Sequence, residues 1–132
     1  MANILTNLAR AMITAALKAS GYTEPVYVGW GTGAGTSAAA DTTLFTEKAL
    51  DLSATTGTRP TGTTSRVTTS VTNDTWQNQA TLTATGAGTV TNAGCWDNSA
   101  IGSGNLALKS DFTGIGLAIG DSIQFTFKAQ FS

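Results

Sequence analysis

The sequence predicts a mainly β protein, an antiparallel β-sandwich or flattened barrel that carries one N-terminal α-helix. The first observation is that residues 4–19 are the only long stretch whose apolar positions recur at helical spacing. The second is that the period changes to two after Gly21, where short segments rich in Thr and Val alternate with turn residues. The chain of 132 residues has the length of one domain. We therefore expect a single domain over residues 1–132, with the sandwich at residues 26–131.

The predicted helix at residues 4–19 separates polar side chains from apolar ones. Asn3 is expected to cap its start, and Gly21 follows its end. Its apolar face is broad, and such a face is stable only when it packs against another surface. We expect the helix to dock on the sheet or on a second copy of the chain. The residues expected to make this contact are Leu5, Leu8, Met12 and Ile13.

The predicted strands are connected by short turns, as in antiparallel sandwiches. Asn73 and Asp74 are expected to form a two-residue hairpin turn, because both residues tolerate positive φ. Residues 53–65 are polar and contain Pro60, which predicts an exposed loop. Residues 113–121 contain several glycines and are expected to form a connection. The strands are expected at residues 26–30, 49–52, 66–72, 75–85, 89–97, 105–112 and 122–131.

The charge content of the chain is low. Charged residues make up 11% of the sequence, against roughly 25% in an average soluble domain. The seven basic residues are scattered, whereas binding to a phosphate backbone needs them clustered, so we expect no nucleic-acid partner. No apolar run approaches the about 18 residues that span a membrane, so we expect no membrane contact. A surface of this kind suits a protein that lies against protein neighbours.

The residue types also argue against the common catalytic sites. The sequence has no histidine, which excludes Ser-His-Asp, Cys-His and His-metal sites. Cys95 is the only cysteine, so no internal disulfide forms, and we expect the thiol to be buried. The glycines Gly31, Gly33 and Gly35 lack the lysine and the spacing of a phosphate-binding loop. Four of the eight acidic residues, Asp74, Asp97, Asp111 and Asp121, stand at turns or strand ends, where acids form local hydrogen bonds. We therefore expect no enzyme activity, no metal and no cofactor.

Four residues are candidate contacts with a partner. Arg59 and Arg66 stand at the tip and the base of the polar loop, and each can offer an ionic contact. Trp76 and Trp96 stand at strand ends, where partial exposure is expected. Two alternatives stay open at this point: the tryptophans can belong to the core, and Arg59 can be a solvated charge.

Several runs of this sequence resemble small virion structural proteins of tailed bacteriophages. The runs are YVGWGTGAG (residues 27–35), AADTTLFTE (39–47), RVTTSVTNDTWQ (66–77), TVTNAGCWD (89–97) and LKSDFTGIGLAIGDSIQFTFKAQF (108–131). The similarity is to short head-decoration (cement) proteins and related tail-associated β-proteins, and it covers most of the chain.

This resemblance implies a β-sandwich that binds the outer surface of the capsid as a dimer or trimer. Its partner would be the major capsid protein, and its role would be to lock neighbouring shell subunits together. The resemblance supplies no catalytic residue. The alternative is a tail-fibre or receptor-binding module of a phage tail, for which exposed tryptophans would speak.

Overall fold

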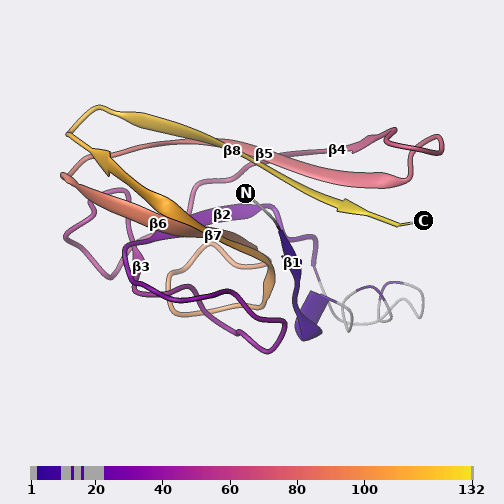
Figure 1. The fold of residues 1–132 in the computed structure, drawn as a ribbon, viewed down its shortest axis with the longest axis horizontal. Helices are drawn as coiled ribbons and strands as arrows, with labels where there is room; N and C mark the ends of the chain where they lie inside the picture. The colour runs from indigo at the N-terminus through magenta and orange to yellow at the C-terminus, as the bar shows by residue number, and fades with distance from the viewer. Residues whose placement is uncertain (1–2, 10–12, 14–15, 17–22, 132) are drawn as a thin grey trace.

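The computed structural model of the chain describes residues 3–9, 13, 16 and 23–131. Two antiparallel sheets are stacked face to face (Figure 1). One is five-stranded in the order β1-β7-β6-β2-β3, and the other is three-stranded in the order β4-β5-β8. The strands are β1 (Ile4–Leu5), β2 (Tyr27–Gly31), β3 (Glu47–Lys48), β4 (Thr63–Val67), β5 (Thr75–Thr83), β6 (Gly88–Trp96), β7 (Leu106–Leu117) and β8 (Ser122–Gln130). The predicted fold class is confirmed.

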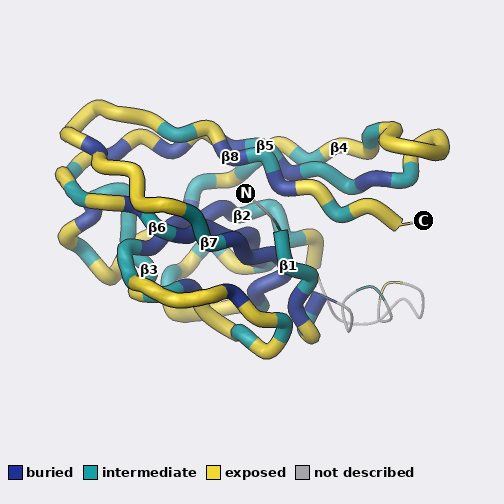
Figure 2. Tube along the Cα trace, in the orientation of Figure 1, coloured by how far each residue is buried: buried dark blue, intermediate teal, exposed yellow. Residues whose placement is uncertain are grey.

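The core lies between the two sheets. Trp30 from β2 meets Phe125 from β8 edge-on, and Phe125 stacks on its strand neighbour Phe127. The indole N–H of Trp30 donates to the carbonyl of Ala49 at 2.8 Å, so this fully buried tryptophan keeps its hydrogen bond. Cys95 is buried as expected, and burial raises the pKa of its thiol. Figure 2 shows that burial is concentrated where the sheets face each other.

The N-terminal segment begins as a strand and becomes helical later than predicted. Ile4 and Leu5 pair with Leu108 and Lys109 of β7, so Leu5 is not helical. Residues 7–9, 13 and 16 are helical. The cap is Thr6, whose Oγ1 accepts the N–H of Ala9 at 3.1 Å. The prediction of a helix starting at residue 4 with Asn3 as its cap is therefore wrong, because Ile4 and Leu5 form an edge strand that pairs with β7.

Asn3 has a different role, because its side chain bridges the two sheets. Its Nδ2 donates to the carbonyl of Lys128 in β8 at 3.3 Å, and its Oδ1 accepts the hydroxyl of Ser110 in β7 at 2.7 Å. One amide thus connects a strand of the five-stranded sheet to a strand of the three-stranded sheet.

The β4–β5 connection is longer than the predicted two-residue turn. Val67 pairs with Thr75, so residues 68–74 form the loop. The Asp74 carboxylate accepts the backbone N–H groups of Thr69, Ser70 and Val71 at 2.8–3.0 Å. These hydrogen bonds, led by the one from Thr69, hold the pKa of Asp74 well below its usual range. Because this carboxylate holds residues 69–71 in the loop, β4 ends at Val67 and not at residue 72; it begins at Thr63, which pairs with Gln79 of β5.

Two other strand predictions also need correction. The short edge strand is Glu47–Lys48 and not residues 49–52, because Trp30 and Gly31 pair there. The strand β7 continues through the glycine-containing segment to Leu117, where a connection was expected, because β6 still runs alongside it. Among the described residues, no helix is long and apolar enough to cross a membrane.

Candidate partner-binding site

Arg59 is buried, and it holds a loop against the outer face of the five-stranded sheet. Its side chain forms an ion pair with Glu47 at 2.5 Å, and its Nη1 donates to the carbonyls of Asn98, Ala100 and Ser103. The guanidinium also lies 3.8 Å from the centre of the Trp96 ring. We call Arg59, Glu47 and Trp96 the Arg59 cluster.

The Arg59 cluster removes two of the predicted partner contacts. Arg59 is 3% exposed and Trp96 is 2% exposed, so neither is accessible to a partner. The prediction that Arg59 is an exposed loop tip is wrong, because its hydrogen bonds are made inside the molecule. The Trp96 indole N–H has no hydrogen-bond partner among the described residues, so the ring is held by packing and by the cation above it. Most of residues 53–65 are exposed, as predicted, but Arg59 anchors the segment at its centre and residues 63–65 belong to strand β4.

A second buried cation lies on the same sheet. Lys109 is fully buried, and its Nζ donates to Asp41 at 2.7 Å and to the carbonyl of Thr43 at 2.9 Å. The ammonium also lies over the ring of Phe45. The hydrogen bond from Lys109 lowers the pKa of Asp41. In the sequence, this lysine is one of seven scattered basic residues, and its place directly after the apolar run of residues 106–108 gave no sign of the pairing with Asp41.

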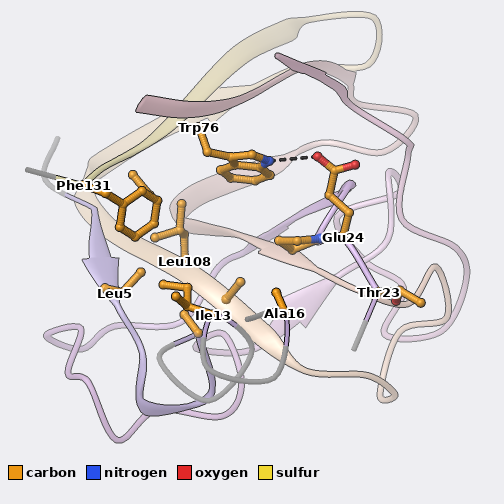
Figure 3. Close-up of a pocket in the computed structure, with 12 residues that line it drawn as sticks. Leu5, Ile13, Ala16, Thr23, Glu24, Trp76, Leu108 and Phe131 are labelled. Atoms are coloured by element: carbon orange, nitrogen blue, oxygen red, sulfur yellow. Dashed lines mark hydrogen bonds between the residues drawn. The ribbon is translucent and has the colours of Figure 1, made fainter. Parts of the chain in front are cut away.

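An apolar cavity of about 360 Å³ lies at one end of the sandwich (Figure 3). It lies where the three-stranded sheet, β7 and the N-terminal segment meet. We call it the Trp76 cavity. Its lining residues are Leu5, Ala9, Ile13, Ala16, Thr23, Glu24, Pro25, Trp76, Ala107, Leu108, Ala129 and Phe131.

The Trp76 cavity brings together several of the residues predicted as contacts. Trp76 is half-buried, and its indole N–H donates to Oε1 of Glu24 at 2.9 Å, as Figure 3 shows. Leu5 and Ile13, both predicted docking residues, lie on its wall. Arg66 is directly opposite Trp76 across β4 and β5, so the two side chains share a face of the sheet. Arg66 is exposed and remains available to a partner.

The other two predicted docking residues do not line the cavity. Leu8 is half-buried. Met12 lies outside the described residues. Sequence reasoning missed Glu24 and Phe131 as part of this site; the only signal was that Glu24 precedes Pro25 at the start of a strand.

Two backbone amides of the glycine-rich segment after β2 are engaged within the fold. The N–H groups of Thr32 and Gly33 donate to the carbonyls of Thr46 and Phe45 at 3.1 and 2.9 Å. A cradle for phosphate needs such N–H groups to be free. Among the described residues, no group of three or more His, Cys, Asp or Glu side chains is placed to hold a metal ion.

No protein family, no curated protein and no solved structure matches this chain.

Proposed function

We propose that this chain is a capsid decoration (cement) protein that binds the outer surface of a tailed-bacteriophage head and stabilises the shell. Its partner is the major capsid protein. The support from the sequence is the resemblance described above, together with a charged fraction of 11%.

The observation that carries the proposal is the Trp76 cavity. An apolar cavity beside an aromatic side chain is the kind of pocket in which an anchor side chain of a partner contributes most of the binding energy. Trp76 supplies a rigid wall, and the exposed Phe131 and Arg66 extend the surface around it. We propose that an apolar side chain of the shell protein enters this cavity. Repetition of one modest contact over a symmetric shell then gives lasting attachment.

The burial of Trp30 and Trp96 argues against the alternative function, a tail-fibre or receptor-binding module. A tail-fibre or receptor-binding module was favoured by exposed tryptophans, but Trp30 and Trp96 are both buried. Only Trp76 is left to face a ligand. This distribution favours one anchoring site over a broad aromatic platform.

The test adds purified protein to shells that lack it and follows co-sedimentation and the temperature at which DNA is released. The wild-type protein should saturate at a fixed ratio to the major capsid protein and should raise the release temperature. Ala16 is exposed and lines the cavity, so Ala16→Glu should weaken binding by about tenfold or more without loss of the fold, because it places a charge in an apolar contact.

The matched control is Ile119→Glu, at the exposed β7–β8 turn and outside the cavity. It should leave shell binding unchanged. If Ile119→Glu abolishes binding and Ala16→Glu does not, the cavity is not the contact. Protein that attaches only to tails, with no copies on the shell, contradicts the proposed function.

A further inference from the structure

Strand β8 lies at the edge of the three-stranded sheet. β8 is nine residues long and is the last strand of its sheet, and no other strand of the described residues pairs with its outer side. An edge of this length presents a row of unpaired N–H and C=O groups, which is a template for pairing with another strand.

The hydrogen bonds show which residues of β8 face outward. The carbonyl of Asp121 accepts the N–H of Ala84, and the N–H of Phe131 donates to the carbonyl of Asp74. The backbone N–H and C=O groups of the odd-numbered residues therefore point toward β5. The carbonyl of Lys128 accepts Nδ2 of Asn3, which lies on the other side. Backbone groups alternate in direction along a strand. The N–H and C=O groups of Ser122, Gln124 and Thr126 therefore point away from the sheet.

The other edges of the sandwich carry features that prevent pairing. β1 and β3 are two residues long, and β4 has five residues with the charged Arg66 among them. β7 has an irregular register opposite β6 between Asp111 and Ile115, and it contains two glycines. Natural sheets protect their edges with short strands, charges and bulges. β8 pairs regularly with β5 from end to end and contains no proline or glycine.

We propose that β8 pairs with β8 of a second copy of this chain, antiparallel about a two-fold axis at Gln124. Two three-stranded sheets then join into one continuous sheet of six. The pairing of Ser122, Gln124 and Thr126 with Thr126, Gln124 and Ser122 of the other copy forms about six main-chain hydrogen bonds. This inference does not depend on what the protein binds.

The side chains of β8 make this register self-complementary. On the outer face, Gln124 meets its own copy and Ser122 meets Thr126, so polar groups face polar groups. On the inner face, Phe125 meets Ile123, which extends the apolar layer from one copy into the next; both already pack in the core. Lys128, the one charged residue of β8, lies opposite the uncharged Gly120. A partner strand of unrelated sequence has no such built-in match.

The position of Asn3 argues against an axis closer to the C-terminal end of β8. An axis moved to Thr126 would require the carbonyl of Lys128 for pairing, but Asn3 already occupies that carbonyl. With the axis at Gln124, pairing uses only the groups between Ser122 and Thr126. The Asn3 bridge and the dimer are therefore compatible.

The experiment measures the mass of the purified full chain by sedimentation equilibrium. The wild-type protein should reach twice the 13.4 kDa of one chain. Gln124→Pro removes the outward N–H and should weaken dimerisation by roughly tenfold or more, because a central hydrogen-bonded pair is lost. The matched control Gln124→Ala keeps the N–H and should remain a dimer.

A pair of charge variants tests the register without a change in the backbone. Gln124→Lys and Gln124→Glu should each dimerise roughly fivefold more weakly, because each places like charges opposite one another. Mixing the two should restore a dimer. If Gln124→Pro does not fold, the two charge variants still test whether the dimer forms through β8. A monomeric wild-type protein, or a dimer that none of these substitutions changes, overturns the proposal.

Discussion

Trp96 and Trp76 each have a charged neighbour, but the two charges act differently. Trp96 lies under the Arg59 guanidinium on the outer face of the five-stranded sheet, and the cation covers it. Trp76 belongs to the three-stranded sheet and donates to the Glu24 carboxylate at one side of a cavity that stays open. The Arg59 guanidinium shields the Trp96 ring from solvent, whereas the Glu24 carboxylate orients the Trp76 ring beside the cavity. An aromatic residue near a charge is thus a binding element only where the charge leaves its face free.

The largest expected effect is at the Arg59 cluster. Arg59→Ala should lower the free energy of unfolding by about 3–5 kcal/mol, because Glu47 is left buried without its partner. Urea denaturation followed by circular dichroism measures this. The matched control is the exposed Arg66→Ala, which should change the free energy of unfolding by less than about 0.5 kcal/mol. Equal effects of the two substitutions would mean that Arg59 does not anchor its loop.

Conservative replacement of each tryptophan compares the two regions directly. Trp96→Phe should lower the free energy of unfolding by about 1–3 kcal/mol, because it weakens the contact with Arg59 and leaves a void in a sealed cluster. Trp76→Phe removes one partly exposed hydrogen bond and should cost about 1 kcal/mol or less. Thermal and urea unfolding of the two variants show which substitution lowers the free energy of unfolding more. The reverse order would show that Trp76 supports the fold more than it serves the cavity.

The smallest expected effect is the dependence of stability on pH that Asp74 produces in the loop of residues 68–74. The pKa of Asp74 is lowered in the folded state, so its contribution to stability is present above the unfolded pKa and is lost as pH falls from about 4 toward the lowered value. Asp74→Asn should reduce the melting temperature at pH 7 and flatten its decline in acid. Gln130→Ala removes only one side-chain donor to Asp74 and should have a smaller effect. An unchanged acid profile in Asp74→Asn would contradict this role.

The strands could be predicted where their signal is local. The alternation of Phe125 and Phe127 with polar residues fixes β8 almost to its ends, because a period of two needs no knowledge of the neighbours. The start of the helix could not be predicted, because Ile4 and Leu5 fit the helical pattern until β7 is available to pair with them.

The candidate site could be predicted only in part. Arg66 and Trp76 were predicted as contacts because a strand end beside a loop is an accessible place; Arg66 is exposed and Trp76 half-buried, and their contact with a partner stays a prediction. The burial of Arg59 could not be found from the sequence, because it depends on a glycine in another strand. A side chain on Gly29 would place its Cβ 2.8 Å from Oε1 of Glu47, so the Glu47 carboxylate would have to move from its present position beside Arg59. The predictions of a single domain and of the capsid partner stay predictions.

The amide of Asn3 has a consequence for the order in which the molecule folds. It reaches from the third residue of the chain to Ser110 and Lys128, and the adjacent β1 pairs with Lys109. The two partners of Asn3 lie 107 and 125 residues further along the sequence. Asn7 in the same segment donates to the carbonyl of Ala39 at 2.7 Å, whereas Asn3 can form its hydrogen bonds only after β7 and β8 are present. Contacts between such distant residues slow folding. Closure of the sandwich by Asn3 is accordingly expected to be a late event, which follows the pairing of β5 with β8.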